Sequence, residues 1–196
     1  ACLVGSEMCI RDRYRERYLL FTPCRQDGYE KDRETFQRKC RQGEEPKGYF
    51  VMAYGVRLTM GYLEGYVAEQ EESIRCGDGE TIWYAYLAVD EKSSWWNNQT
   101  YVNTLDKPAL DRFIHITHER YYEKVGADFG KSIPAIFTDE PQFAEMENLN
   151  FAEEKKPVRL PFTDDFDESF QTAYGASLLE HLPEVIWEKG KDTAAT

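Results

Sequence analysis

The sequence predicts an α/β protein with parallel strands, and two segments carry this prediction. An apolar run at residues 133–137 lies between Gly130 and Pro141, which is typical of a strand buried on both faces of a sheet. A second apolar stretch at residues 81–89 is followed by a helical pattern over residues 106–125. A strand, a helix and a strand in this order form a βαβ unit, in which the strands are parallel and the crossover is right-handed.

The helix of this unit has recognisable ends. Asp106 is a good N-cap, and Pro108 fits the first turn, where no backbone N–H is needed. Gly126 suits the position just after the last turn. His115 and His118 are interpreted as exposed or capping residues rather than a metal pair, since no third ligand is evident. Apolar positions recur on one helix face at Leu110, Phe113, Ile114, Thr117 and Tyr121.

The preceding part of the chain is expected to be richer in strands. Residues 18–21, 49–57 and 62–68 are rich in aromatic and branched apolar side chains and predict strands, the last two as a hairpin. Residues 26–45 are strongly polar and are interpreted as a solvated loop or a short helix. An acidic turn that contains glycine is expected at residues 69–80.

Composition and charge disfavour several classes of partner. The chain of 196 residues has a formal net charge of −12, which argues against nucleic acid and anionic membrane surfaces. No apolar run approaches the roughly 20 residues of a membrane span. Cys24, Cys40 and Cys76 form no CxxC pair, and no histidine lies at metal-ligand spacing, so neither a disulfide framework nor a zinc site is expected. We therefore expect reduced thiols in a cytoplasmic protein that uses no metal or other cofactor.

The N-terminal segment is interpreted as foreign to the protein. Residues 3–12, Leu-Val-Gly-Ser-Glu-Met-Cys-Ile-Arg-Asp, resemble the translation of a transposase-type sequencing adapter. We treat residues 1–13 as an artefactual, adapter-derived segment and expect the natural N-terminus, with any signal peptide, to be missing. The interpretable part is then residues 14–196.

Polar and aromatic side chains follow both strands of the predicted βαβ unit. Asp139 and Glu140 come directly after the second strand, which Pro141 ends. The loop after the first strand contributes aromatic and amide side chains, namely Trp95, Trp96, Asn97, Asn98, Gln99 and Tyr101. Both groups should share one site, because the carboxyl ends of parallel strands open on the same face of a sheet. Aromatic rings stack on sugars, amides hydrogen-bond to hydroxyls, and a carboxylic acid can protonate a glycosidic oxygen, so a carbohydrate ligand is predicted.

Three stretches in the middle of the chain carry a resemblance. They are Trp-Trp-Asn-Asn-Gln-Thr-Tyr-Val-Asn (95–103), Thr-His-Glu-Arg-Tyr-Tyr-Glu-Lys-Val-Gly (117–126) and Phe-Gly-Lys-Ser-Ile-Pro-Ala-Ile-Phe-Thr-Asp-Glu-Pro-Gln-Phe (129–143). Together with residues 160–165 and 170–183, they resemble the large bacterial glycoside hydrolases described as α-L-rhamnosidase-like. The resemblance implies that residues 14–196 form an incomplete (β/α)8 TIM-barrel fragment with long loops, because a whole barrel takes about 250 residues. The remainder of the catalytic domain is then expected to be missing.

The resemblance also implies roles for the acidic pair. The Thr-Asp-Glu-Pro run at residues 138–141 is similar to the Asn-Glu-Pro run of many barrel glycosidases, in which the glutamate is the acid or acid/base. By position this catalytic role falls on Glu140, and Asp139 becomes a substrate-binding or supporting residue. A second carboxylate must flank the scissile bond, and it is expected to lie on a later strand outside this chain. The predicted function is that of a glycoside hydrolase fragment, acting on plant or microbial glycans in its parent protein and inactive alone.

Other interpretations stay open. A non-catalytic carbohydrate-binding remnant would use the two tryptophans, with Glu140 serving only as a hydrogen-bonding group. A metal-dependent hydrolase would place Asp139, Glu140 and the pair Asp164-Asp165 around Ca²⁺ or Mg²⁺. That second pair also fits the N-cap of a helix starting near Asp167. In the simplest case the tryptophans are core residues and the acidic pair is a plain strand-to-loop turn.

Overall fold

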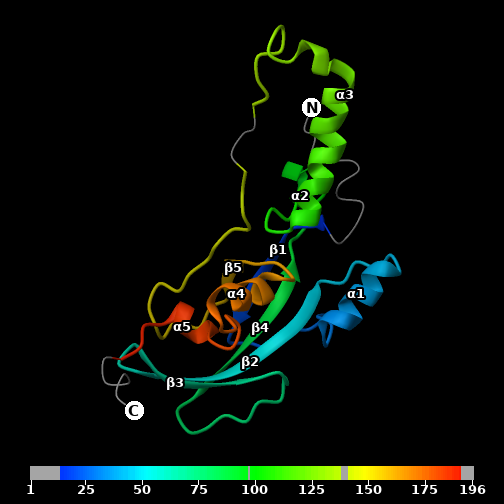
Figure 1. Cartoon of the computed structure of the whole chain (residues 1–196). Helices are drawn as coiled ribbons and strands as arrows, with labels where there is room; N and C mark the ends of the chain where they lie inside the picture. Colours follow the sequence, from blue (N-terminus) through cyan, green and yellow to red (C-terminus); the bar gives the residue numbers. More distant parts are fainter. Residues whose placement is uncertain (1–13, 97, 138–140, 191–196) are drawn as a thin grey trace. The chain divides into compact units, whose positions relative to one another are not determined.

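The structure of this protein is a computed structural model, which describes residues 14–96, 98–137 and 141–190 (Figure 1). The chain divides into two compact units. We call Arg17–Val89 with Glu145–Thr196 the sheet unit, and Ala1–Glu16 with Asp90–Ala144 the helical unit.

The sheet unit is built on one five-stranded sheet. Its strands are β1 (Arg17–Thr22), β2 (Gly48–Thr59), β3 (Tyr62–Glu69), β4 (Thr81–Val89) and β5 (Val158–Pro161). Their spatial order is β3-β2-β4-β1-β5, and every neighbouring pair is antiparallel. The predicted (β/α)8 TIM barrel is therefore wrong, because a TIM barrel consists of parallel strands.

The central strands are buried on both faces, which explains their high apolar content. Side chains alternate between the faces along each strand. One face carries the main core and includes Leu19, Phe21, Tyr54, Trp83 and Leu87. The opposite face carries a smaller cluster around Phe50, Ala53 and Tyr86, against which Leu20, Tyr29 and Tyr84 pack. An irregularity between Phe50 and Met52 shifts the β2–β4 register by one residue. Because of this shift, Tyr49 and Met52 lie on the main-core face, while Phe50 and Ala53 lie on the opposite face.

The predicted strands before residue 90 are confirmed. The segments predicted at residues 18–21, 49–57, 62–68 and 81–89 correspond to β1, β2, β3 and β4. β2 and β3 form the expected hairpin, which turns at Met60 and Gly61, both with positive φ. Gly48 at the start of β2 requires glycine, since a Cβ there would lie 2.0 Å from the Leu87 carbonyl oxygen.

Three helices contribute to the main core of the sheet unit. They are α1 (Arg33–Arg41), α4 (Phe166–Tyr174) and α5 (Leu182–Ile186). α1 forms in the polar segment where a loop or short helix was expected, and the Asp32 carboxylate caps it by accepting from the Thr35 N–H at 2.7 Å. α4 confirms the helix predicted near Asp167, and it ends at Gly175, whose φ is 79°.

An aromatic cluster fixes α5 to the sheet. Phe21 and Trp83 stack with their ring centroids 4.8 Å apart, and Trp187 meets Trp83 edge-on at 5.2 Å. The Trp187 indole N–H donates to the Ala152 carbonyl at 2.8 Å, so the same residue also holds the loop that precedes β5. Burial of these rings contributes several kcal/mol, with each ring–ring contact adding about 1 kcal/mol.

A buried ion pair joins β1 to the chain that follows β5. The Arg17 guanidinium, only 4% exposed, pairs with the Asp164 carboxylate and lies over the Phe36 ring of α1. The Tyr49 hydroxyl donates to the same carboxylate at 3.1 Å. Burial raises the pKa of Tyr49 to about 12, so its hydroxyl stays a donor at neutral pH.

Short bridges lie at both edges of the sheet. At the β3 edge, the Leu63 N–H donates to the Glu188 carbonyl at 2.8 Å, and the Gly190 N–H donates to the Leu63 carbonyl at 3.3 Å. At the β5 edge, Glu147 and Arg159 exchange backbone hydrogen bonds of 3.0 and 3.2 Å.

The helical unit contains the long helix that the sequence predicts over residues 106–125. It consists of α2 (Lys107–Ile114), a π-helical turn (His115–Glu119) and α3 (Arg120–Val125), and Asp106 occupies its N-cap position (Figure 1). A short core forms where Ala109 packs with Tyr14 and Val102. The expected apolar stripe is only partly correct. Ile114, which precedes the π turn, is exposed, and Ile116 packs instead. Tyr121, which follows the turn, is also exposed, because the wider turn rotates the side chains after it.

The strand predicted at residues 133–137 does not exist. These residues lie outside the sheet, and Ile136 and Phe137 are 51% and 85% exposed. The partners of β4 are β1 and β2, so the strand–helix–strand pairing inferred from the sequence is also wrong. The error has a physical cause: an apolar run satisfies the pattern of a buried strand without showing that a partner strand exists.

Replacing Asp164 by Asn removes the carboxylate that neutralises the buried Arg17. We expect the free energy of unfolding to fall by about 2 kcal/mol, somewhat less than for a fully buried pair, because the Asp164 side chain is 22% exposed. Urea unfolding followed by tryptophan fluorescence measures this change. Asp165→Asn, at the exposed neighbouring position, is the control and should change stability by less than about 0.5 kcal/mol. Equal stability of the two variants would contradict a structural role for the ion pair.

Candidate functional site

The predicted sugar-binding loop folds as a compact unit of its own, which we call the tryptophan loop (residues 93–101). Ser93 and Gln99 form an antiparallel bridge at its base, and the Ser93 N–H donates to the Gln99 carbonyl at 2.9 Å. Inside the loop, the Trp96 N–H donates to the Ser93 carbonyl at 3.1 Å. Asn98 closes the turn with a φ of 59°, a conformation that asparagine tolerates better than most residues.

The two tryptophans of this loop have different environments. Trp96 is half-buried and packs on Tyr101, with the ring centroids 4.6 Å apart. Trp95 is 80% exposed, and its ring stands at 87° to that of Trp96. Trp96 therefore supports the loop, whereas Trp95 presents a large apolar face to solvent.

The polar members of the predicted site lie beside these rings. Asn98 is exposed and Gln99 is half-buried, and both belong to the same turn. Asn97 lies outside the described residues. An exposed indole beside amide groups can stack on the C–H face of a sugar and hydrogen-bond to its hydroxyls.

The two acidic residues of the predicted site, Asp139 and Glu140, lie outside the described residues. Their placement beside the tryptophan loop was inferred from parallel strands, and that inference fails with the barrel. One contact nevertheless links the two segments, since the Thr104 hydroxyl donates to the Gln142 carbonyl at 2.8 Å. The chain just after Glu140 therefore lies against the chain just after Tyr101. The catalytic role of Glu140 stays a prediction.

One of the two aspartates considered for a metal site is held in an ion pair. Asp164 pairs with Arg17, whereas Asp165 stands at the N-cap position of α4 without a side-chain hydrogen bond to the helix. In the helical unit, His115 Nδ1 lies 2.6 Å from a Glu119 carboxylate oxygen, and His118 Nδ1 lies 2.9 Å from the Thr117 hydroxyl. Across the described part of the chain, no group of three or more His, Cys, Asp or Glu residues could hold a metal ion.

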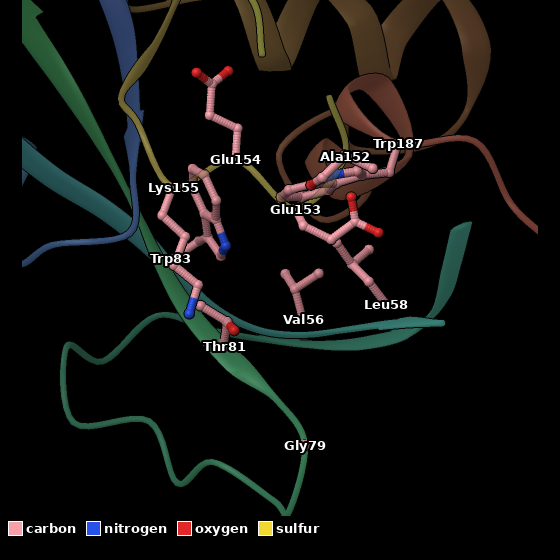
Figure 2. A pocket seen from close by; sticks show the side chains of 10 residues that line it. All are labelled: Val56, Leu58, Gly79, Thr81, Trp83, Ala152, Glu153, Glu154, Lys155 and Trp187. Carbon is pink, nitrogen blue, oxygen red and sulfur yellow. The ribbon is translucent and has the colours of Figure 1, made fainter. Parts of the chain in front are cut away.

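A pocket of about 200 Å³ in the sheet unit was not foreseen from the sequence (Figure 2). Trp83 of β4 and Trp187 after α5 form its apolar wall, and residues 152–155 form its rim. Two of its polar groups serve the fold: the Trp187 N–H is bonded to Ala152, and the Glu154 carboxylate accepts from the Asn150 N–H at 2.6 Å. Trp83 and Trp187 are far apart in the sequence. Nothing in the sequence indicates that they meet or that residues 152–155 lie beside them.

A polar network in the same unit joins β3 to α5. The Tyr66 hydroxyl donates to Glu184 Oε1 at 2.7 Å and lies 2.8 Å from His181 Nδ1, while Lys189 contacts the other Glu184 oxygen at 2.8 Å. Burial, followed by the hydrogen bond to Glu184, raises the pKa of Tyr66. The network ties β3 to α5 and to Lys189 after it.

Comparison with known proteins adds no relative: neither protein-family models, nor curated proteins, nor solved structures match this chain. No helix within the described ranges is both long and apolar enough to cross a membrane.

The two tryptophans should respond differently to truncation. Trp95→Ala removes a side chain that is mostly in solvent, so the free energy of unfolding should change by less than about 0.5 kcal/mol. Trp96→Ala removes the ring that packs on Tyr101 and should cost about 1–2 kcal/mol. Chemical unfolding of both variants measures the difference. An equal cost would show that Trp95 also supports the fold and is not held for a ligand.

Proposed function

We propose that this protein is carbohydrate-active and that the tryptophan loop contacts the sugar. The observation that carries the proposal is the exposure of Trp95 on a loop whose base is closed by backbone hydrogen bonds. Exposing the Trp95 indole to water is unfavourable. The loop does not need this side chain for its shape, because Trp96 already anchors it on Tyr101. A flat apolar platform of this kind suits the C–H face of a pyranose ring.

The neighbouring groups support a sugar better than a purely apolar ligand. Asn98 and Gln99 each offer an amide donor and an amide acceptor, and sugar hydroxyls need both. The chain carries an excess of acidic residues, which suits a neutral ligand better than a polyanion.

Within this class, we propose that the parent protein is a glycoside hydrolase of the α-L-rhamnosidase-like type. The support is the resemblance of residues 95–103, 117–126 and 129–143, together with the contact of Thr104, three residues beyond the tryptophan loop, with Gln142, two residues beyond Glu140. Because the barrel is wrong, the role of Glu140 now rests on the Thr-Asp-Glu-Pro run alone. Glu140 would protonate the departing glycosidic oxygen while a second carboxylate activates water or attacks the anomeric carbon.

A binding module without catalysis is the second candidate, because the exposure of Trp95 favours sugar contact whether or not Glu140 acts as an acid. The metal-dependent alternative has lost its main support, since Asp164 is paired with Arg17. A cytoplasmic location is part of the proposal and is supported by Cys24, Cys40 and Cys76, none of which is in a disulfide.

Sugar binding can be read directly on this chain. Titration with methyl α-L-rhamnoside and with rhamnose-containing oligosaccharides, followed by calorimetry, should give saturable binding that weakens about tenfold in Trp95→Ala, as expected for loss of one stacking contact. Tyr121→Ala, which truncates an exposed aromatic residue on α3, is the control and should bind normally. Binding that is absent, or equally affected by both variants, would reject the role of the loop.

Catalysis is tested separately through Glu140. In a full-length relative that carries the Thr-Asp-Glu-Pro run at the matching position, Glu140→Gln should lower turnover by about 10²–10⁴-fold while sugar affinity stays nearly unchanged. Initial rates on an aryl rhamnoside and calorimetry with the intact sugar measure the two quantities. Normal turnover in the Glu140→Gln variant would reject the role of Glu140 as the catalytic acid, and only the sugar-binding proposal would remain.

A further inference from the structure

An open groove with both apolar and polar walls lies at the tip of the β2–β3 hairpin in the sheet unit. Its volume is about 510 Å³, and its walls include Met60, Tyr62, Phe151 and Ile186. Met60, Phe151 and Tyr62 expose 91%, 61% and 48% of their surfaces. The groove shares Ala152, Glu153 and Trp187 with the pocket of Figure 2, so Trp187 of the aromatic cluster lines both.

Met60 is not explained by the fold. Its φ of 52° and the φ of 82° at Gly61 form a tight hairpin turn, in which Asn, Asp or Gly is the preferred residue at the first position. A methionine there has an unfavourable backbone conformation and an apolar side chain in water. Neither turn preference nor packing favours it, and together with the exposed Tyr62 and Phe151 it forms a contiguous apolar patch of the kind that contacts another molecule.

The charges around the groove indicate what that molecule carries. Among the described residues that line it, the charged ones are Glu153 and Glu188, and no Lys or Arg lines it. A second copy of this chain is disfavoured, because each copy has a net charge of −12. The rings of Tyr62 and Trp187 could stack on a sugar, but aliphatic side chains such as Met60, Leu149 and Ile186 and the lack of an amide among the described lining residues favour apolar side chains as the contents of the groove.

We propose that this groove binds a partner polypeptide through a segment with large apolar side chains flanked by Lys or Arg. The apolar side chains fill the groove against Phe151 and Ile186, and the flanking cations face Glu153 and Glu188. Met60 covers the segment from the hairpin tip, where its flexible thioether chain can adapt to different apolar shapes. The groove belongs to the sheet unit, and the proposed sugar site belongs to the helical unit.

The probes are three labelled helical peptides of equal length, one of Leu and Lys, one of Leu and Glu, and one of Ser and Lys. Fluorescence anisotropy with the full chain should show saturable binding of the Leu/Lys peptide only.

Met60→Asn should weaken this binding at least about tenfold, since an apolar side chain leaves the interface. The same substitution should keep or raise the melting temperature, because asparagine suits the turn. The double variant Glu153→Gln/Glu188→Gln should weaken binding and reduce its dependence on salt.

Met146→Asn is the matched control, because Met146 is 57% exposed and does not line the groove. Unchanged binding in this variant, with loss in Met60→Asn, supports the proposal. Equal effects of the two substitutions, or equal binding of the Ser/Lys peptide, would reduce the interaction to nonspecific charge attraction and overturn it. Concentration-dependent dimerisation that Met60→Asn abolishes would overturn it in favour of a second copy, and competition by an oligosaccharide would overturn it in favour of a sugar.

Discussion

The contact of Phe21, Trp83 and Trp187 is the interaction on which the sheet unit depends. It joins a strand from the start of the chain, a strand from its middle and the segment after α5. Because the Trp187 indole also binds the Ala152 carbonyl, the loop over the pocket and the wall of the hairpin groove are positioned by the same ring. Trp187 therefore contributes both to the stability of the sheet unit and to the shape of its pocket and groove.

In the tryptophan loop of the helical unit, one tryptophan stabilises the loop and the other is exposed to solvent. Trp96 contacts Tyr101 and gives the loop its shape, while the adjacent Trp95 contributes little to that shape and remains accessible. This division allows the exposed side chain to vary with the ligand without loss of the fold. It also explains why the proposed sugar contact rests on one indole, although two are adjacent in the sequence.

Local pattern predicted much of the secondary structure but not its arrangement. The alternating strands before residue 90 and the helix after Asp106 are confirmed because side-chain periodicity and capping are local properties. Strand pairing is not local. β4 pairs with β1 and β2, so the segment at 133–137 has no place in the sheet, and the barrel inferred partly from it fails. In the candidate site, the sequence named the tryptophan loop, but only burial distinguishes Trp95 from Trp96, and only contacts show that Asp164 neutralises Arg17.

The short bridges at the two margins of the sheet have a consequence for behaviour at high concentration. A strand with unsatisfied amides and carbonyls along its side is a template for pairing with other chains and for amyloid-like assembly. Here the segment around Lys189 lies along β3 and Glu147 lies along β5, so each outer strand has part of its hydrogen-bonding capacity occupied. An acidic chain whose outer strands are shielded in this way is protected against polymerisation by both electrostatic repulsion and geometry.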